Sequence, residues 1–182
     1  EMNVLHSIIL PKTVKYLGSY SLASLHLNST LVLPESVTNI EGFAFDRSAF
    51  DIVLPSKLER LEGCAFYGSL VRGELVLPNT LKYIGGSAFC NVTSFYGNFT
   101  LPASLEYLGD WAFQNCIGLT ELKIPDGTYM YTLNDFNLAL EFALISEGVL
   151  NISYFSTPSS KILRTSVFSS SAIAFHSFFY TL

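Results

Sequence analysis

The sequence carries little charge. Asp, Glu, Lys and Arg make up 14% of its 182 residues, and 15 acidic against 10 basic side chains give a net charge of −5. Nucleic-acid binding depends on clustered Lys and Arg, and the chain has no such cluster, so we predict no nucleic-acid partner. Hydrophobic residues make up 49% of the chain. This composition excludes intrinsic disorder, because a chain this apolar can build a core.

Long hydrophobic runs are also missing. A membrane-spanning helix needs about 18 or more predominantly apolar residues, and the nearest candidate, 138–150, is interrupted by Glu141 and Glu147. The N-terminus shows no basic segment followed by an apolar stretch, which is the pattern of a signal peptide. We therefore expect a mature or excised fragment without a membrane span.

Residues typical of catalysis or metal binding are few. The chain has three cysteines (Cys64, Cys90 and Cys116), three histidines and no Cys-x-x-Cys pair. We interpret the cysteines as small buried hydrophobic residues, with a disulfide as the alternative. Nucleophile-elbow, phosphate-loop, dinucleotide and His-Glu-x-x-His motifs are absent. We predict that the chain is not an enzyme and has no catalytic residue, cofactor or metal site, although a Cys116–His176 pair stays open as a catalytic alternative.

The prolines are regularly spaced. Six of the seven follow one another at intervals of 23, 21, 23, 24 and 23 residues: Pro11, Pro34, Pro55, Pro78, Pro102 and Pro125. A fixed period of this length indicates a repeat architecture in which each unit must stack on its neighbours to bury a core.

Alignment on these prolines gives columns of one residue type. Aliphatic residues precede each proline: Leu10, Leu33, Leu54, Leu77, Leu101 and Ile124. Most of the units also carry a phenylalanine eleven residues after the proline: Phe45, Phe66, Phe89, Phe113 and Phe136. The alternation before each proline is that of a short strand, which proline ends because it lacks a backbone donor. Stacked units would pair these strands at about 4.8 Å and align the phenylalanines as a ladder of rings.

The run Leu101-Pro102-Ala-Ser-Leu105-Glu-Tyr-Leu108-Gly109-Asp-Trp-Ala112-Phe113-Gln-Asn-Cys116 continues to the strand that ends Ile124-Pro125. It resembles the BspA-type leucine-rich repeat, and the resemblance covers about residues 8–136. Three departures are clear: the cysteine after Ala-Phe is present only as Cys116, the leucine six before proline survives only as Leu5 and Leu119, and the first unit has Ser21-Leu22 in place of Ala-Phe. The resemblance implies a β-rich leucine-rich repeat solenoid with about six units of 21–24 residues.

The C-terminal part departs from the repeat. We predict a solenoid over 1–136 and, in the same domain, a divergent repeat or irregular C-terminal cap over 137–182, because a solenoid needs an atypical unit to cover its last core layer. A helix is expected over 133–145 and a strand over 149–155. The apolar tail 174–180 either packs against the last repeat or would be covered by further repeats.

The resemblance also implies a function. Proteins of this family are typically cell-surface or secreted proteins that adhere to host, matrix or cell-surface proteins. We expect a non-enzymatic protein-binding module; the alternative is a substrate-presenting or spacer module of a larger surface enzyme. A binding face is predicted from side chains two and four residues before each proline, which should point outward: Ile9, Val32, Val53, Val76, Thr100 and Lys123, flanked by Asp51, Glu74 and Glu121. The aliphatic members indicate either a sticky face for a protein or simple β propensity, and both interpretations stay open.

Overall fold

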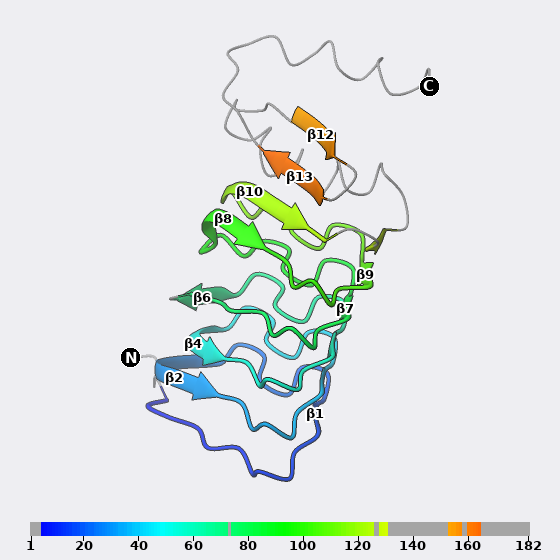
Figure 1. Ribbon diagram of the computed structural model, residues 1–182. Helices are drawn as coiled ribbons and strands as arrows, with labels where there is room; N and C mark the ends of the chain where they lie inside the picture. The colour runs from blue at the N-terminus through cyan, green and yellow to red at the C-terminus, as the bar shows by residue number, and fades with distance from the viewer. Residues whose placement is uncertain (1–4, 73, 126–127, 131–152, 158–159, 165–182) are drawn as a thin grey trace.

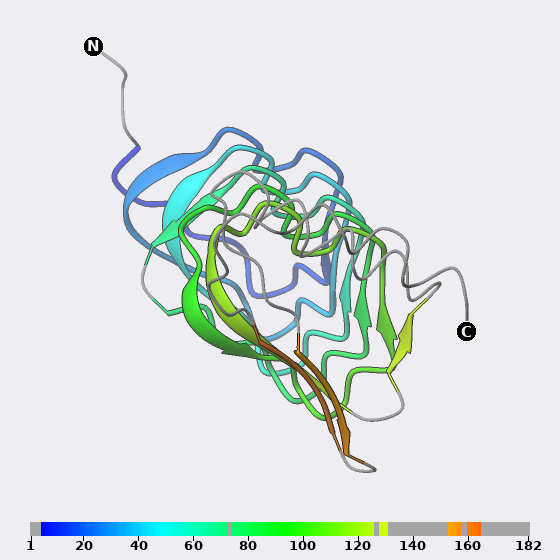
Figure 2. The ribbon, with the colours of Figure 1, turned by 90° about the horizontal axis from the view of Figure 1, so that it is seen from above.

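The computed structural model describes residues 5–72, 74–125, 128–130, 153–157 and 160–164. Within these residues the chain forms strands and turns and no helix. Successive turns stack into a parallel β-solenoid (Figure 1), so the predicted fold class is confirmed. Seen along the stack in Figure 2, the turns overlie one another.

The strands that precede the prolines line one side of the solenoid. A three-stranded parallel sheet contains β2 (His26–Val32), β4 (Ala49–Val53) and β6 (Leu70–Arg72). Further along, β8 (Tyr96–Thr100) pairs in parallel with β10 (Gly118–Ile124). We call the outward surface of these five strands, with the segments that continue them to the prolines, the strand face.

A second sheet runs up the opposite side and continues through every described turn. Its strands are two residues long and pair in parallel: β1 (Tyr16–Leu17), β3 (Asn39–Ile40), β5 (Arg60–Leu61), β7 (Tyr83–Ile84), β9 (Tyr107–Leu108) and β11 (Tyr129–Met130). The sequence did not predict this sheet, because two residues are too few to show an alternating pattern. Its aliphatic members Leu17, Ile40, Leu61, Ile84 and Leu108 are buried.

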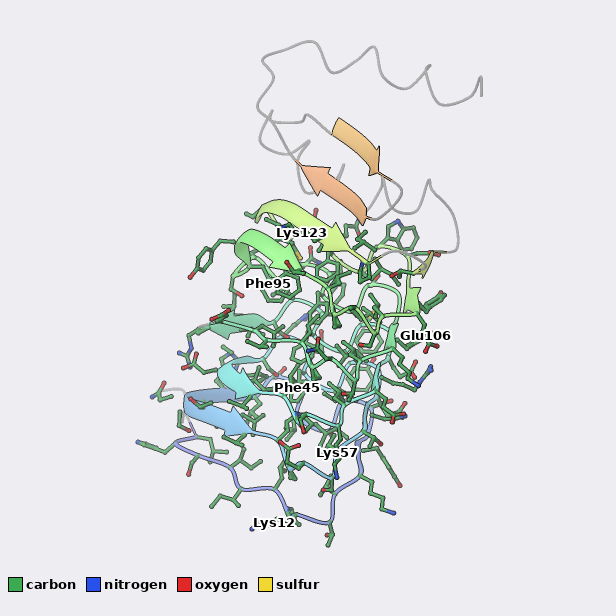
Figure 3. All side chains as sticks on the ribbon, in the orientation of Figure 1. Lys12, Phe45, Lys57, Phe95, Glu106 and Lys123 are labelled. Carbon is green, nitrogen blue, oxygen red and sulfur yellow. The ribbon has the colours of Figure 1, made fainter. Side chains whose placement is uncertain are left out.

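The third side carries the Ala-Phe column, and its backbone also bonds from turn to turn. The amide of Phe45 donates to the carbonyl of Ala65 at 2.8 Å, and the amide of Phe66 donates to the carbonyl of Ala88 at 2.8 Å. The rings of Phe45, Phe66, Phe89 and Phe113 stack at centroid distances of 4.8, 5.3 and 5.1 Å and are almost fully buried. The predicted ladder of rings is therefore confirmed from Phe45 to Phe113, and its last predicted member, Phe136, lies outside the described residues. Figure 3 places Phe45 and Phe95 inside the stack, with Lys12 and Glu106 directed outward.

The end of the described chain changes strand direction. β13 (Ser160–Arg164) pairs antiparallel with β10, and β12 (Ser153–Thr157) pairs antiparallel with β13. The predicted strand over 149–155 overlaps β12, whereas 149–152 and the predicted helix over 133–145 lie outside the described residues. The division at 136/137 and the capping role of 137–182 stay predictions.

Candidate functional site

An aliphatic stripe crosses the strand face. The side chains of Ile9, Val32, Val53 and Val76 are 92%, 61%, 51% and 66% exposed. The side chains that alternate with them along each strand point inward: those of Leu31 and Ile52 are almost fully buried. Val32 and Val53 are register partners, and Thr100 and Lys123, both exposed, are partners further along. The expected outward side chains therefore lie on the surface, with the stripe running along the solenoid axis.

The acidic flank is less regular than the sequence indicated. Thr30 opposes Asp51 as expected, but Asp51 opposes Arg72 and not Glu74. The cause is the unequal length of the units: the interval from Pro34 to Pro55 is 21 residues and the next is 23, so the residue four before Pro78 is Glu74, two positions beyond the register partner of Asp51. Glu74 is exposed and Asp51 is half-buried. Asn98 and Glu121 pair by their backbones, and the side chain of Glu121 lies outside what the structure describes.

The side chain of Arg72 reaches across the short unit between Pro34 and Pro55. Its guanidinium donates a hydrogen bond to the carbonyl of Leu27, two turns away, and its Nε lies 3.8 Å from Oδ1 of Asp51. The β2–β4 register shifts between His26 and Thr30, which leaves the Leu27 carbonyl at the irregularity. Sequence reasoning missed Arg72; the only available signal was the short interval between Pro34 and Pro55.

Further apolar side chains join the strand face at its other margin. Tyr96 begins β8 and is 80% exposed, and Leu70 begins β6 and is 49% exposed. Ile117, directly before β10, is also exposed. These residues were not predicted, because they precede the alternating segments that the proline alignment identifies.

The opposite sheet has an ordered outer surface of a different kind. The guanidinium carbon of Arg60 lies 3.9 Å from the ring centroid of Tyr83, whose ring stacks on Tyr107 at 4.7 Å with an interplanar angle of 7°. Nε of Arg60 also donates to Oε1 of Glu62 at 2.9 Å. The ring of Tyr83 thus lies between Arg60 and Tyr107, and the contacts within this column favour a structural role.

All three thiols are free, and burial makes them poor nucleophiles. Burial raises the pKa of Cys90 to about 11, with a contribution from nearby Cys64, and raises the pKa of Cys64 and Cys116 as well. The thiolate is the reactive form, so these groups are protonated and weakly reactive near neutral pH. In the described part of the chain, no three His, Cys, Asp or Glu side chains gather as a metal site would require, and no helix there is long and apolar enough to cross a bilayer. His176, the alternative catalytic partner of Cys116, lies outside the described residues.

Three backbone-bonded sides, a ring ladder and an outward strand face define a repeat protein of the parallel β-solenoid class. The sequence matches the family described as "BspA type Leucine rich repeat region (6 copies)" over residues 1–94 and again over residues 51–181. The chain therefore belongs to the BspA-type leucine-rich repeat family. This agrees with the resemblance inferred from the sequence.

One similar solved structure is a leucine-rich repeat protein from Bacteroides ovatus ATCC 8483. It is 19% identical, with a TM-score of 0.41, and the similarity covers 69% of this chain and 38% of that chain. The chain thus spans well under half the length of that protein. A search of the curated proteins found no match.

Proposed function

We propose that this chain is a non-enzymatic protein-interaction module of a cell-surface or secreted protein, and that it binds a host, matrix or cell-surface protein through the strand face. Leucine-rich repeats form extended surfaces suited to protein partners. The proposal assigns the contact to the aliphatic stripe and its polar flank: Ile9, Val32, Val53, Val76, Thr100, Lys123, Asp51, Glu74 and Glu121. The family resemblance supports the cell-surface localisation in this proposal.

One observation carries the choice of face. Among the described residues, eleven large hydrophobic side chains are exposed, and seven of them lie on the strand face or at its margin: Ile9, Val32, Val53, Leu70, Val76, Tyr96 and Ile117. Leu5 is the bridge partner of buried Leu27 and therefore faces the same way as the core side chains. The other three, Tyr16, Tyr20 and Trp111, are spread over the remaining surface. β Propensity explains a branched residue in a strand, but it does not explain why Leu70, Tyr96 and Ile117 gather on the same side. Contiguous exposed apolar surface usually marks an interaction site.

The test is a binding screen of the purified chain against a panel of purified matrix and cell-surface proteins, with two variants. Val76→Asp places a charge in the middle of the stripe, where the side chain is 66% exposed, and Tyr16→Asp places the same charge on the opposite sheet at 67% exposure. We expect Val76→Asp to lose the captured protein and Tyr16→Asp to retain it, with both melting close to the parent chain. Capture that survives Val76→Asp but is lost with Tyr16→Asp would assign the contact to the other sheet.

A further inference from the structure

The strand face is interrupted once, between β6 and β8. β6 pairs with β4 and ends the three-stranded sheet, while β8 pairs only with β10. The intervening segment Glu74–Leu77 runs toward Pro78 without joining a strand on either side (Figure 1). Its side chains still alternate as in a strand, with Leu75 and Leu77 buried and Val76 exposed.

The missing backbone bonds can be identified from equivalent positions. In two turns the amide directly before the proline bonds to the next turn: Leu33 donates to the carbonyl of Val53 at 3.1 Å, and Leu101 donates to that of Lys123 at 2.9 Å. In the described chain, the equivalent amides of Leu54 and Leu77 make no such bond. Both side chains are also more exposed, at 9% against 2% for Leu33 and Leu101.

The interruption has a source in the sequence. The β4–β6 register sets residues 21 apart opposite each other, as Asp51 and Arg72 are, whereas the next pairing along the chain, β5 with β7, sets Arg60 opposite Tyr83, which are 23 apart. The chain after Arg72 therefore contains two more residues than an unbroken ladder requires, and Gly73 and Glu74 directly follow the last paired residue in the sequence. Extra residues in one strand disrupt pairing locally.

On the other two sides of the solenoid, the backbone bonds between these same turns are intact. β5, β7 and β9 pair without a break in the opposite sheet. On the third side the amide of Phe66 donates to Ala88 at 2.8 Å, and that of Phe89 donates to Ala112 at 2.7 Å. When two neighbouring turns are bonded on two sides and unbonded on the third, they can open and close on the unbonded side. This motion breaks no backbone hydrogen bond.

We propose that Glu74–Leu77 is a hinge in the strand face. It exchanges between the unpaired arrangement seen here and a paired one, in which Leu54 and Leu77 donate to the next turn as Leu33 and Leu101 do. The paired arrangement aligns Val53, Val76 and Thr100 in one column, and the unpaired one divides the face at β6. If the proposed function holds, this motion lets the face adapt to its partner; the hinge itself does not depend on that function.

Amide hydrogen exchange followed by NMR on the free chain tests the premise of the hinge, the unpaired amides of Leu54 and Leu77, without any partner. We expect the amides of Leu54 and Leu77 to exchange about 100-fold or more faster than those of Leu33 and Leu101, because local opening can cost almost nothing while paired positions open at far higher free energy. Equal protection at all four amides would overturn the proposal. A failed binding screen would leave this result untouched, so the two proposals fail separately.

Shortening the segment tests its cause. A variant that lacks Gly73 and Glu74 keeps the inward and outward alternation, and we expect its Leu54 and Leu77 amides to slow to the rate of Leu33. A variant that lacks Asn28 and Ser29 is the matched control: it removes two residues at the β2 irregularity, beside a ladder that is already paired. Its Leu54 and Leu77 amides should stay fast, and slowing by both deletions would refute a local cause.

Distance measurements cover the case in which the deletion prevents folding. In a Cys64→Ser background, spin labels at Val53→Cys and Thr100→Cys span the hinge, and labels at Val32→Cys and Val53→Cys lie within one sheet. We expect a broader distance distribution for the first pair than for the second. Equally narrow distributions would refute the hinge.

Discussion

The hydroxyl of Ser69 donates a 2.5 Å hydrogen bond to the backbone carbonyl of Phe45, one turn earlier in the stack. Ser69 has no exposed surface and lies fourteen residues after its proline. At the equivalent position of another turn, the thiol of Cys116 donates to the carbonyl of Phe89 at 3.1 Å. The family's cysteine after Ala-Phe is thus replaced in this turn by a smaller donor that makes the same contact.

This equivalence predicts how position 69 tolerates substitution. Ser69→Ala removes the donor from a fully buried site and should lower the free energy of unfolding by about 1–3 kcal/mol. Ser69→Cys restores a donor with the chemistry of Cys116 and should recover a measurable part of that loss. Urea denaturation of the three proteins measures the difference. An alanine variant as stable as the cysteine variant would show that the hydrogen bond contributes nothing.

The repeat columns explain how much of this fold the sequence predicted. Proline spacing, the strand before each proline and the Phe45–Phe113 ladder all depend on one residue type recurring at one position, which a single sequence displays directly. The two-residue strands of the opposite sheet form because the turns stack, so no local sequence pattern predicts them. The contacts of Arg72 and the break after it depend on differences in length between neighbouring units, and only the three-dimensional register shows where the offset between units changes. The outward position of Ile9, Val32, Val53 and Val76 was therefore predictable from the sequence, whereas the apolar side chains at the margin of the strand face and its division after β6 were not.

The ring ladder predicts a large cost for truncation in its middle. Phe89 stacks on Phe66 at 5.3 Å and on Phe113 at 5.1 Å and has no exposed surface. Phe89→Ala should therefore lower the free energy of unfolding by about 3–5 kcal/mol. Tyr20→Ala is the matched control, because Tyr20 also stacks, on Phe43 at 4.9 Å, but is 58% exposed.

The control should cost less than about 1 kcal/mol, since it removes one exposed aromatic contact. Thermal and urea denaturation of both variants give the comparison. Similar losses for the two variants, or a loss below about 1 kcal/mol for Phe89→Ala, would contradict a core role for the ladder.

Two glycines at the same repeat position should respond in opposite ways to a methyl group. A Cβ on Gly109 would lie 2.3 Å from the backbone nitrogen of Gly86 in the preceding turn, whereas a Cβ on Gly18 would meet nothing within 4 Å. Gly109→Ala must push two backbones apart and should cost about 2 kcal/mol or more. Gly18→Ala should change stability by less than about 0.5 kcal/mol. Melting temperatures measure both, and equal tolerance would mean that the turns are not in close contact at Gly86.

Alkaline pH should destabilise the fold through its buried thiols. Burial, reinforced by nearby Cys64, raises the pKa of Cys90 from 9.0 to about 11. Between these values the unfolded chain releases the proton while the folded chain keeps it, so the free energy of unfolding falls as pH rises. The stabilising contribution of Cys90 is complete below pH 9 and is lost as pH passes about 11.

Cys90→Ala isolates this contribution, because the two proteins differ in no other ionisable side chain. We expect the unfolding free energy of the parent chain to decline more steeply than that of Cys90→Ala between pH 9 and pH 11, with parallel behaviour below pH 8. Urea denaturation at a series of pH values under reducing conditions measures both slopes. If the two proteins decline in parallel across the whole range, the Cys90 thiol loses its proton as readily in the folded chain as in the unfolded one, and the packing around it admits water.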